Sequence, residues 1–272
     1  DVGMLKTGFL DLDDAIGGLR PGEMTVLAGR PGIGKSTLAW DIARHVALRG
    51  KVLWCSTEMI AAQILDREMA YQTGVSLQRL WQGKYGDDLG GDIQEGLAKI
   101  SEQAIYLVDG QLTTNSIRAA VEEMVAHYNL TAIFVDYLQG LADNYGTSGN
   151  DRVSYISRTL KDIARIYSVP VVVVSQLNRA PEYRDDKRPK LGDLRDSGAI
   201  EQDADCALLM YRDDYYLENE AEFNAHYKGK VQWHFQRGVC SITIAKLRQL
   251  ESGKYVNLVW VKGGYKDIAR RV

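Results

Sequence analysis

The stretch Gly29-Arg30-Pro31-Gly32-Ile33-Gly34-Lys35-Ser36-Thr37 decides the fold of this chain. It is a complete G-x-x-x-x-G-K-[ST] loop, a pattern whose backbone N–H groups surround the phosphates of a nucleoside triphosphate. The glycines let the backbone approach the phosphates closely. Lys35 then reaches the β- and γ-phosphates, and the Ser36 hydroxyl binds Mg²⁺. The loop therefore predicts a nucleotide-binding site.

The segments on either side of the loop support this interpretation. Residues 24–28 read as a buried strand, and residues 37–48 carry apolar side chains at helical spacing, at Leu38, Ile42 and Val46. The alternative is a glycine-rich turn with an exposed lysine. Such a turn needs no strand before it and no helix after it, so the order strand, loop, helix favours the nucleotide site.

The composition is that of an ordinary globular chain. It has 272 residues, 45% hydrophobic and 25% charged, and no linker rich in Pro, Gly or Ser, so we expect one domain over residues 1–272. The net charge of −3 argues against a generally basic nucleic-acid surface but leaves room for a local basic stripe. No run has transmembrane length and no signal peptide is visible, so we expect no membrane partner.

The cysteines indicate a cytoplasmic protein. Cys55, Cys206 and Cys240 lie in or beside apolar runs, no C-x-x-C pair occurs, and the four histidines are scattered, so a zinc site is not expected. Buried thiols suit a reducing compartment. Because the sequence begins at Asp1 without an initiator methionine, we expect upstream sequence to be missing.

Strand-like and helix-like stretches alternate along most of the chain. Strands are expected at residues 24–28, 51–55, 104–108, 131–136, 170–175 and 205–211. Helices are expected at residues 37–49, 60–73, 92–101, 114–128 and 152–168. Continuously apolar strands need cover on both faces, which is typical of a parallel sheet wrapped by helices. Residues 241–247 and 255–261 alternate like an antiparallel hairpin, and two long polar loops, 142–151 and 178–197, follow strands, where such sheets bind ligands.

Three polar side chains follow apolar strands at positions suited to nucleotide chemistry. Asp136 would help Ser36 to hold Mg²⁺, and the loop upstream favours this role over a simple turn. Glu58 is either the base that activates the attacking water or a first-turn helix residue that favours the helix dipole, with Thr57 as the N-cap. Gln176 is either a γ-phosphate sensor or a polar strand end, and its residue type alone favours the second.

Two cations stand close together in the expected hairpin. Lys246 and Arg248 are two residues apart on a strand, so both project from one face, about 7 Å from each other. One interpretation is a charged edge strand that discourages aggregation. The other is an arginine finger that reaches a neighbouring subunit's nucleotide and raises the rate by about 10³–10⁵. The pattern leaves both open.

Together these motifs resemble the C-terminal motor domain of DnaB-type replicative DNA helicases over nearly the whole chain. The matching segments are residues 7–13, 17–22, 30–36, 56–59, 136–139 and 175–179. The most specific match is residues 187–205, K-R-P-K-L-G-D-L-R-D-S-G-A-I-E-Q-D-A-D. The resemblance implies an α/β fold with a RecA-like P-loop core. Its mostly parallel sheet would be flanked by helices and end in an antiparallel hairpin.

The resemblance also implies roles for single residues. The catalytic residues that it implies are Lys35, Glu58, Gln176, Lys246 and Arg248. Glu58 becomes the general base and Gln176 the γ-phosphate sensor. Lys246 and Arg248 act on the next subunit. Arg67, otherwise a solvated helix charge, packs on the nucleotide base. The loop that grips the DNA backbone comprises Arg195, Asp196, Ser197 and Gly198.

Three departures from the family pattern affect these assignments. Asp196 stands where the family usually has Glu, which shortens a side chain near the DNA. Residues 249–253, Gln-Leu-Glu-Ser-Gly, replace Asn-Gly-Pro-Thr-Gly at the hairpin tip. Residues 217–238 form a longer segment than the family has, rich in Tyr, His and Trp, and a surface loop is the default expectation for them.

The resemblance implies a ring with ATP and Mg²⁺ bound between subunits. A homo-hexamer would surround single-stranded DNA, and its partners would include a primase and a helicase loader. The stretch from Gln176 to Asp196 holds six basic and five acidic residues. Six copies around a pore would offer repeated contacts to phosphates without reading bases. The N-terminal domain and linker helix of such helicases are not visible in this sequence.

Other classes of protein are alternatives to a helicase motor. A RadA/Sms-type or KaiC-type ATPase shares the RecA-like core and a similar hairpin, although RadA/Sms proteins typically add a cysteine-rich zinc segment before it. A non-catalytic module that binds ATP only to assemble is disfavoured, because it needs neither the base Glu58 nor the finger Arg248. A strand-exchange recombinase would lack the signature of residues 187–205. ATP turnover stimulated by single-stranded DNA would separate the assembly module from the enzymes, and unwinding of a forked duplex would then separate a helicase from a recombinase.

Overall fold

The computed structural model describes residues 3–83, 90–194, 197–228, 234–261 and 263–268. Its strands form one sheet in the order β3-β2-β4-β5-β1-β6-β7-β8-β9. The first six in this order pair in parallel: β3 (Ile105–Asp109), β2 (Lys51–Ser56), β4 (Leu130–Asp136), β5 (Val171–Gln176), β1 (Met24–Gly29) and β6 (Cys206–Tyr211). The sheet then continues in antiparallel sense through β7 (Val239–Leu247), β8 (Tyr255–Val261) and β9 (Gly264–Asp267).

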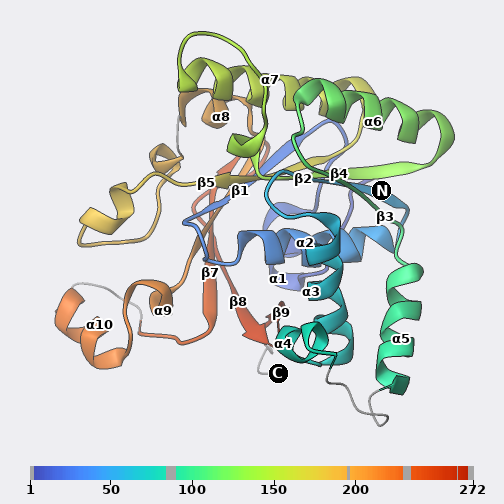
Figure 1. The fold of residues 1–272 in the computed structure, drawn as a ribbon. Coiled ribbons are helices and arrows are strands. Elements are labelled where there is room, and N and C mark those ends of the chain that lie inside the picture. Colours follow the sequence, from blue (N-terminus) through green and yellow to red (C-terminus); the bar gives the residue numbers. More distant parts are fainter. Residues whose placement is uncertain (1–2, 84–89, 195–196, 229–233, 262, 269–272) are drawn as a thin grey trace.

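Helices cover both faces of this sheet (Figure 1). One face carries α6 (Thr114–His127), α7 (Gly149–Tyr167) and α8 (Ser197–Asp203). The other carries α1 (Leu10–Ile16), α2 (Lys35–Ala47) and α3 (Ala61–Thr73). The shorter helices are α4 (Leu77–Trp81), α5 (Gly90–Ser101), α9 (Asp213–Tyr216) and α10 (Glu220–Tyr227). None of the helices within the described ranges has the length and apolarity needed to cross a membrane.

The central strands are apolar throughout because they face two cores. Along β1 every residue is buried, and neighbours alternate between the layers: Leu27 packs toward α2, whereas Val26 and Ala28 pack toward α7. The pattern of continuous apolar residues is therefore explained by cover on both sides. The three cysteines are free and buried, and burial raises the pKa of each thiol to about 12.

The expected elements agree closely with the structure. All six predicted strands and all five predicted helices are present, with ends displaced by three residues at most. The hairpin is confirmed by the antiparallel pairing of β7 with β8, and a further short strand, β9, extends it. The sheet is mixed but mostly parallel, as the fold prediction required.

The segment expected as a surface loop, residues 217–238, is partly helical. It contains α10, whose Phe223 and Tyr227 pack with Leu217 in a small apolar cluster, so the loop prediction is wrong there. The helix spans only 8 residues, too short to present the repeated apolar spacing from which helices are recognised. Asn219 caps it by accepting a hydrogen bond from the N–H of Glu222.

Candidate active site

The phosphate-binding loop joins the end of β1 to the start of α2. Gly32 and Gly34 have φ angles of +76° and +106°, a region that side chains with a Cβ rarely adopt. Tyr265 of β9 contacts the loop directly: its hydroxyl donates a hydrogen bond to the carbonyl oxygen of Ile33 at 3.1 Å. A Cβ on Gly34 would collide with that hydroxyl. Both glycines and the last strand thus determine the shape of the loop.

Lys35 is held inside this loop. Its side chain is buried, and Nζ donates a hydrogen bond to the carbonyl oxygen of Arg30 at 2.9 Å. Burial lowers the pKa of Lys35 to about 8, while the negative charges of Asp136 and Glu58 act to raise it. The cation therefore lies where the loop would surround phosphates, near the carboxylate of Asp136, which ends β4, and that of Glu58, which follows β2.

Asp136 and Ser36 meet at the start of α2. Asp136, the last residue of β4, is 6% exposed. Burial raises the pKa of Asp136 to about 6, against the hydrogen bond from Ser36 and the positive charges of Lys35 and Arg67. Hydroxyl and carboxylate oxygens are the ligands that Mg²⁺ prefers. The two residues therefore fit a magnesium site of the predicted kind.

Glu58 lies beside this pair, in a bend that follows β2. It precedes α3, which begins only at Ala61 with Ile60 as its N-cap, so the alternative that placed Glu58 in the first helical turn with Thr57 as N-cap is wrong. The bend is tied to the end of β4, because the Thr57 N–H donates to the carbonyl oxygen of Asp136 at 2.8 Å. Glu58 is exposed, and its charge is close enough to Lys35 and Asp136 to raise the pKa of both.

Gln176 closes β5, next to the last residue of β1. Its backbone N–H donates to Oε1 of Gln139 at 3.2 Å, and Nε2 of Gln139 donates to Oγ of Ser175 at 3.0 Å. Gln139, which follows β4, thus binds the end of β5. We did not single it out from the sequence, although it ends the motif that begins with Asp136.

Arg30 links the loop to the segment after β5. Its guanidinium donates to Oε1 of Glu182 at 2.8 Å and to the carbonyl oxygen of Leu177 at 2.8 Å. Pro31 and Gly32 are exposed at the tip of the loop. Arg30 thus ties the loop to the segment that follows β5, and its contact with a nucleotide stays a prediction.

A cavity of about 650 Å³ opens beside Ser36 and Asp136. Ser36, Thr37 and Asp136 line it at one end, and the exposed Arg67 of α3 lines it as well. Three tryptophans, Trp40, Trp54 and Trp260, contribute apolar surface. Arg67 therefore lines the same cavity as Ser36 and Asp136, and its contact with a nucleotide base stays a prediction.

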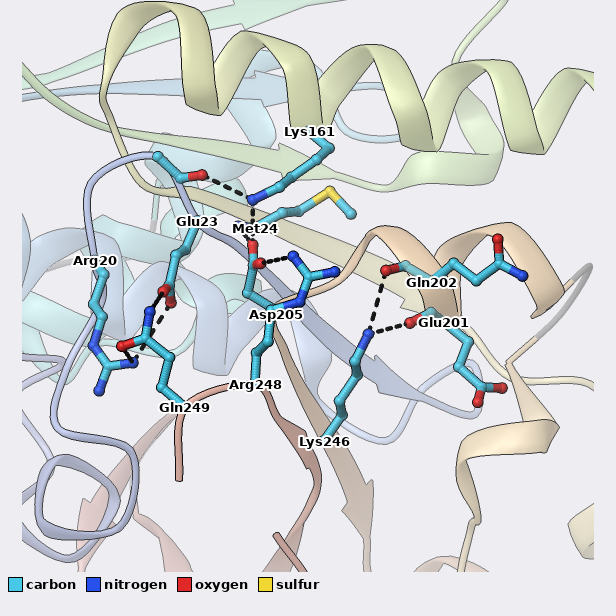
Figure 2. A network of polar contacts seen from close by, with 11 residues as sticks. Arg20, Glu23, Met24, Lys161, Glu201, Gln202, Asp205, Lys246, Arg248 and Gln249 are labelled. Carbon is cyan, nitrogen blue, oxygen red and sulfur yellow. Dashed lines mark hydrogen bonds and ion pairs between the residues drawn. The ribbon is translucent and has the colours of Figure 1, made fainter. Parts of the chain in front are cut away.

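Lys246 and Arg248 lie apart from this cluster, at the end of β7 (Figure 2). Arg248 donates from Nη1 to Oδ1 of Asp205 at 3.0 Å, and Nζ of Lys246 donates to the carbonyl oxygen of Glu201 at 2.5 Å. β7 pairs with β6 as far as Leu247, but with β8 only over residues 239–243, so Lys246 and Arg248 lie beyond the part of β7 that has a neighbour on both sides. Both interpretations of these charges, the edge-strand device and the arginine finger, therefore stay predictions.

The two cations and the phosphate-binding loop occupy opposite ends of the sheet. The Arg248 N–H pairs with the carbonyl oxygen of Asp205, and the Asp205 N–H pairs with that of Met24, the first residue of β1. The loop leaves β1 at its other end, after Gly29. Five residue steps of about 3.3 Å separate these ends by roughly 16 Å, so Arg248 cannot contact a nucleotide in the loop of its own chain.

The predicted DNA loop is described only in part. Arg195, Asp196 and the side chain of Ser197 lie outside the described residues, and Gly198 belongs to the first turn of α8. The contacts expected of this loop therefore stay a prediction.

Comparisons with known proteins agree with this arrangement. Residues 4–266 match the family model of the DnaB-like helicase C terminal domain. The chain is 36% identical to the replicative DNA helicase DnaC of Bacillus subtilis (strain 168), covering 96% of this chain and 56% of that relative. It is 37% identical to the replicative DNA helicase DnaB of Geobacillus stearothermophilus, covering 81% of this chain and 50% of the relative. The chain thus spans about half the length of these curated relatives.

Solved structures give the same result. A DnaB-like replicative helicase, whose structure was described with its interactions with primase, superposes with a TM-score of 0.85 at 28% identity, covering 97% of this chain and 62% of that one. A second solved structure, described as an ATPase domain, superposes with a TM-score of 0.86 at 28% identity, covering 97% and 91%. The family match over nearly the whole chain and the shared fold lead to one conclusion: the chain belongs to the DnaB-like helicase C-terminal domain family.

Proposed function

We propose that this chain is the ATP-driven motor of a replicative DNA helicase, which translocates on single-stranded DNA and unwinds duplex DNA. One observation carries the proposal: the loop, Asp136 and Glu58 gather at one end of the sheet, while Arg248 lies at the other. Each chain then offers half of an active site at either end. Family membership favours this function over a RadA/Sms-type or KaiC-type ATPase.

The half-site at the loop would bind ATP and activate water. Backbone N–H groups of residues 29–37 and Lys35 would hold the phosphates, and Ser36 and Asp136 would hold Mg²⁺. When bound, Mg²⁺ supplies positive charge that offsets the charge developing on the phosphate oxygens. Glu58 would accept the proton of the water that attacks the γ-phosphorus. Gln176, fixed through Gln139, would report the presence of the γ-phosphate to the segment after β5.

The half-site at β7 would complete the pocket of the next subunit. Lys246 and Arg248 would approach the γ-phosphate bound there and stabilise its charge in the transition state. Such head-to-tail contacts close into a ring when the rotation between subunits allows it. We propose a homo-hexamer in the cytoplasm, with the segment Arg195 to Gly198 contacting the DNA backbone.

Two protein partners belong to the proposal. The solved DnaB-like helicase described with its interactions with primase supports a primase as one partner. A helicase loader is the second, proposed from the family alone.

Mixed assemblies test the proposal directly. Arg248→Ala subunits lack the finger and Lys35→Ala subunits lack a working loop, but a mixture contains interfaces with an intact half on each side, about one quarter of them at equal amounts. We expect each variant alone to be inactive and the mixture to recover ATP hydrolysis stimulated by single-stranded DNA. No recovery at any ratio, in assemblies shown to contain both variants, would contradict action between subunits.

A further inference from the structure

Asp205 is a buried carboxylate that contacts the proposed finger directly. Its side chain is 3% exposed. Oδ2 accepts hydrogen bonds from the N–H of Met24 at 2.7 Å and from Nζ of Lys161 at 2.5 Å, and Oδ1 accepts from Nη1 of Arg248 at 3.0 Å. Figure 2 shows these groups meeting where β1, β6, α7 and the end of β7 come together. Asp205 ends the most specific stretch of the sequence, residues 187–205, and is not among the residues for which a role was expected.

The backbone holds Asp205 in place independently of its side chain. Its N–H donates to the carbonyl oxygen of Met24 at 2.9 Å, and its carbonyl oxygen accepts from the N–H of Arg248 at 2.9 Å. Lys161 is fixed in turn, because Nζ also donates to the carbonyl oxygen of Gly22 at 2.9 Å. The carboxylate therefore has one position, with Oδ1 directed at Arg248.

The guanidinium of Arg248 is anchored at Nη1 and otherwise faces outward. Its side chain is 56% exposed, against 14% for that of Lys161. A guanidinium carries five N–H donors in a rigid plane, so Nη1 can stay on Asp205 while the other nitrogens donate to a phosphate. An arginine that is already oriented loses less side-chain freedom on meeting its target. The lysine of the pair, Lys246, is held instead by two backbone carbonyl oxygens of α8.

We propose that Asp205 is the positioning residue for Arg248: its fixed carboxylate anchors Nη1 and points the rest of the guanidinium at the neighbouring subunit's γ-phosphate. Lys161 keeps the carboxylate in place and balances its charge, so that Arg248 is oriented without being neutralised. This assignment rests on the proposed function, in which Arg248 acts on the next subunit. The competing explanation is that Asp205 only joins β6 to β1, through Met24.

Mixed assemblies separate the two explanations, because they tell which end of the subunit is defective. Asp205→Asn should lower kcat for ATP at least about tenfold and leave KM for ATP nearly unchanged, as expected when an interaction made only in the transition state is lost. A mixture of Asp205→Asn with Lys35→Ala subunits should recover ATP hydrolysis, because the Asp205→Asn subunits have an intact loop and the Lys35→Ala subunits an intact finger. A mixture of Asp205→Asn with Arg248→Ala subunits should not recover it, because both variants are defective at the finger.

The opposite pattern would overturn the proposal. If Asp205 acts on its own loop through β1, Asp205→Asn recovers with Arg248→Ala subunits and fails with Lys35→Ala subunits. The mixture of Arg248→Ala with Lys35→Ala is measured in parallel. If that mixture fails, the intersubunit function itself is wrong; if it recovers while Asp205→Asn with Lys35→Ala does not, only the role of Asp205 is wrong.

A double variant gives a second criterion. If Asp205 acts through Arg248, the Asp205→Asn/Arg248→Ala assembly should be no slower than Arg248→Ala alone, because the effects of residues that act as a unit are not additive. Multiplied losses would contradict the proposal. Glu23→Gln is the matched control: this neighbouring carboxylate pairs with Arg20 and Gln249, and its loss should leave kcat within about twofold of the unchanged protein.

A milder variant covers the case in which Asp205→Asn fails to fold. Lys161→Gln removes one charge beside Asp205 but retains a donor for Oδ2. We expect a smaller loss of kcat with the same pattern in mixtures: recovery with Lys35→Ala subunits and none with Arg248→Ala subunits. Full activity of Lys161→Gln, or recovery with Arg248→Ala, would contradict the proposal.

Discussion

Two ionisable side chains of the candidate active site, Lys35 and Asp136, are buried, and this burial lowers the stability of the folded protein. Lys35 and Asp136 are 7% and 6% exposed, and burial moves the pKa of each toward the neutral form, to about 8 and about 6. Each shift means that the ionised group is less stable in the folded protein than in the unfolded chain. Bound nucleotide and metal would supply the missing opposite charges.

The pKa of Asp136 predicts how stability depends on pH without nucleotide. Between its ordinary pKa of 3.8 and the folded value of about 6, the folded protein binds more protons than the unfolded chain, so the free energy of unfolding falls as pH rises. Asp136→Asn removes this contribution. Relative to the unchanged protein, the variant should gain up to about 3 kcal/mol between pH 4 and pH 7.

Chemical denaturation over that range measures the difference. Above pH 7 it should become constant, which serves as an internal control. A difference that does not change between pH 4 and pH 7 would show that the Asp136 carboxyl titrates normally in the folded protein.

Glu58 is expected to carry the proton transfer. Glu58→Gln keeps the shape of the side chain but removes the base, so ATP hydrolysis stimulated by single-stranded DNA should fall by about 10²–10⁴ while nucleotide binding is retained. Glu95→Gln, an exposed carboxylate of α5 paired with Lys99, is the control and should be fully active. Substantial hydrolysis by Glu58→Gln would remove Glu58 from the role of base.

Strands and helices were largely predictable because the sheet is covered on both faces. Apolar runs such as 171–174 and helical spacing such as that of Leu38, Ile42 and Val46 are local signals, and both lead to the elements observed. The short elements gave no such signal. Strand β9 has 4 residues and begins with a glycine, and its contact with the loop joins residues far apart in the chain, which no local pattern reveals.

Strand β9 should nevertheless matter for nucleotide binding. Tyr265→Phe removes the donor to the carbonyl oxygen of Ile33 and leaves the backbone bond to Asp41 in place. We expect the free energy of unfolding to fall by about 1 kcal/mol and KM for ATP to rise, because the loop loses its support. Tyr255→Phe on β8, where the ring is 60% exposed, is the matched control. Equal KM values for the two variants would show that the loop keeps its shape unaided.

The arrangement of the site within an assembly was predictable only through resemblance. Spacing placed Lys246 and Arg248 together on a hairpin but could not tell an edge strand from an interior one, because strand order depends on contacts between distant segments. The sheet order and the position of Asp205 show where the two cations lie: at the end of the sheet that is remote from the loop of their own chain. This separation supports the proposal of an active site shared between neighbours, and family membership supports it as well.

The most direct test of this shared site is a cryo-electron microscopy structure of the assembled protein with a non-hydrolysable ATP analogue and single-stranded DNA. We expect a closed ring in which the Arg248 guanidinium lies about 3 Å from an oxygen of a γ-phosphate that is bound by the loop of the adjacent subunit. A ring in which Arg248 stays remote from every γ-phosphate would contradict it.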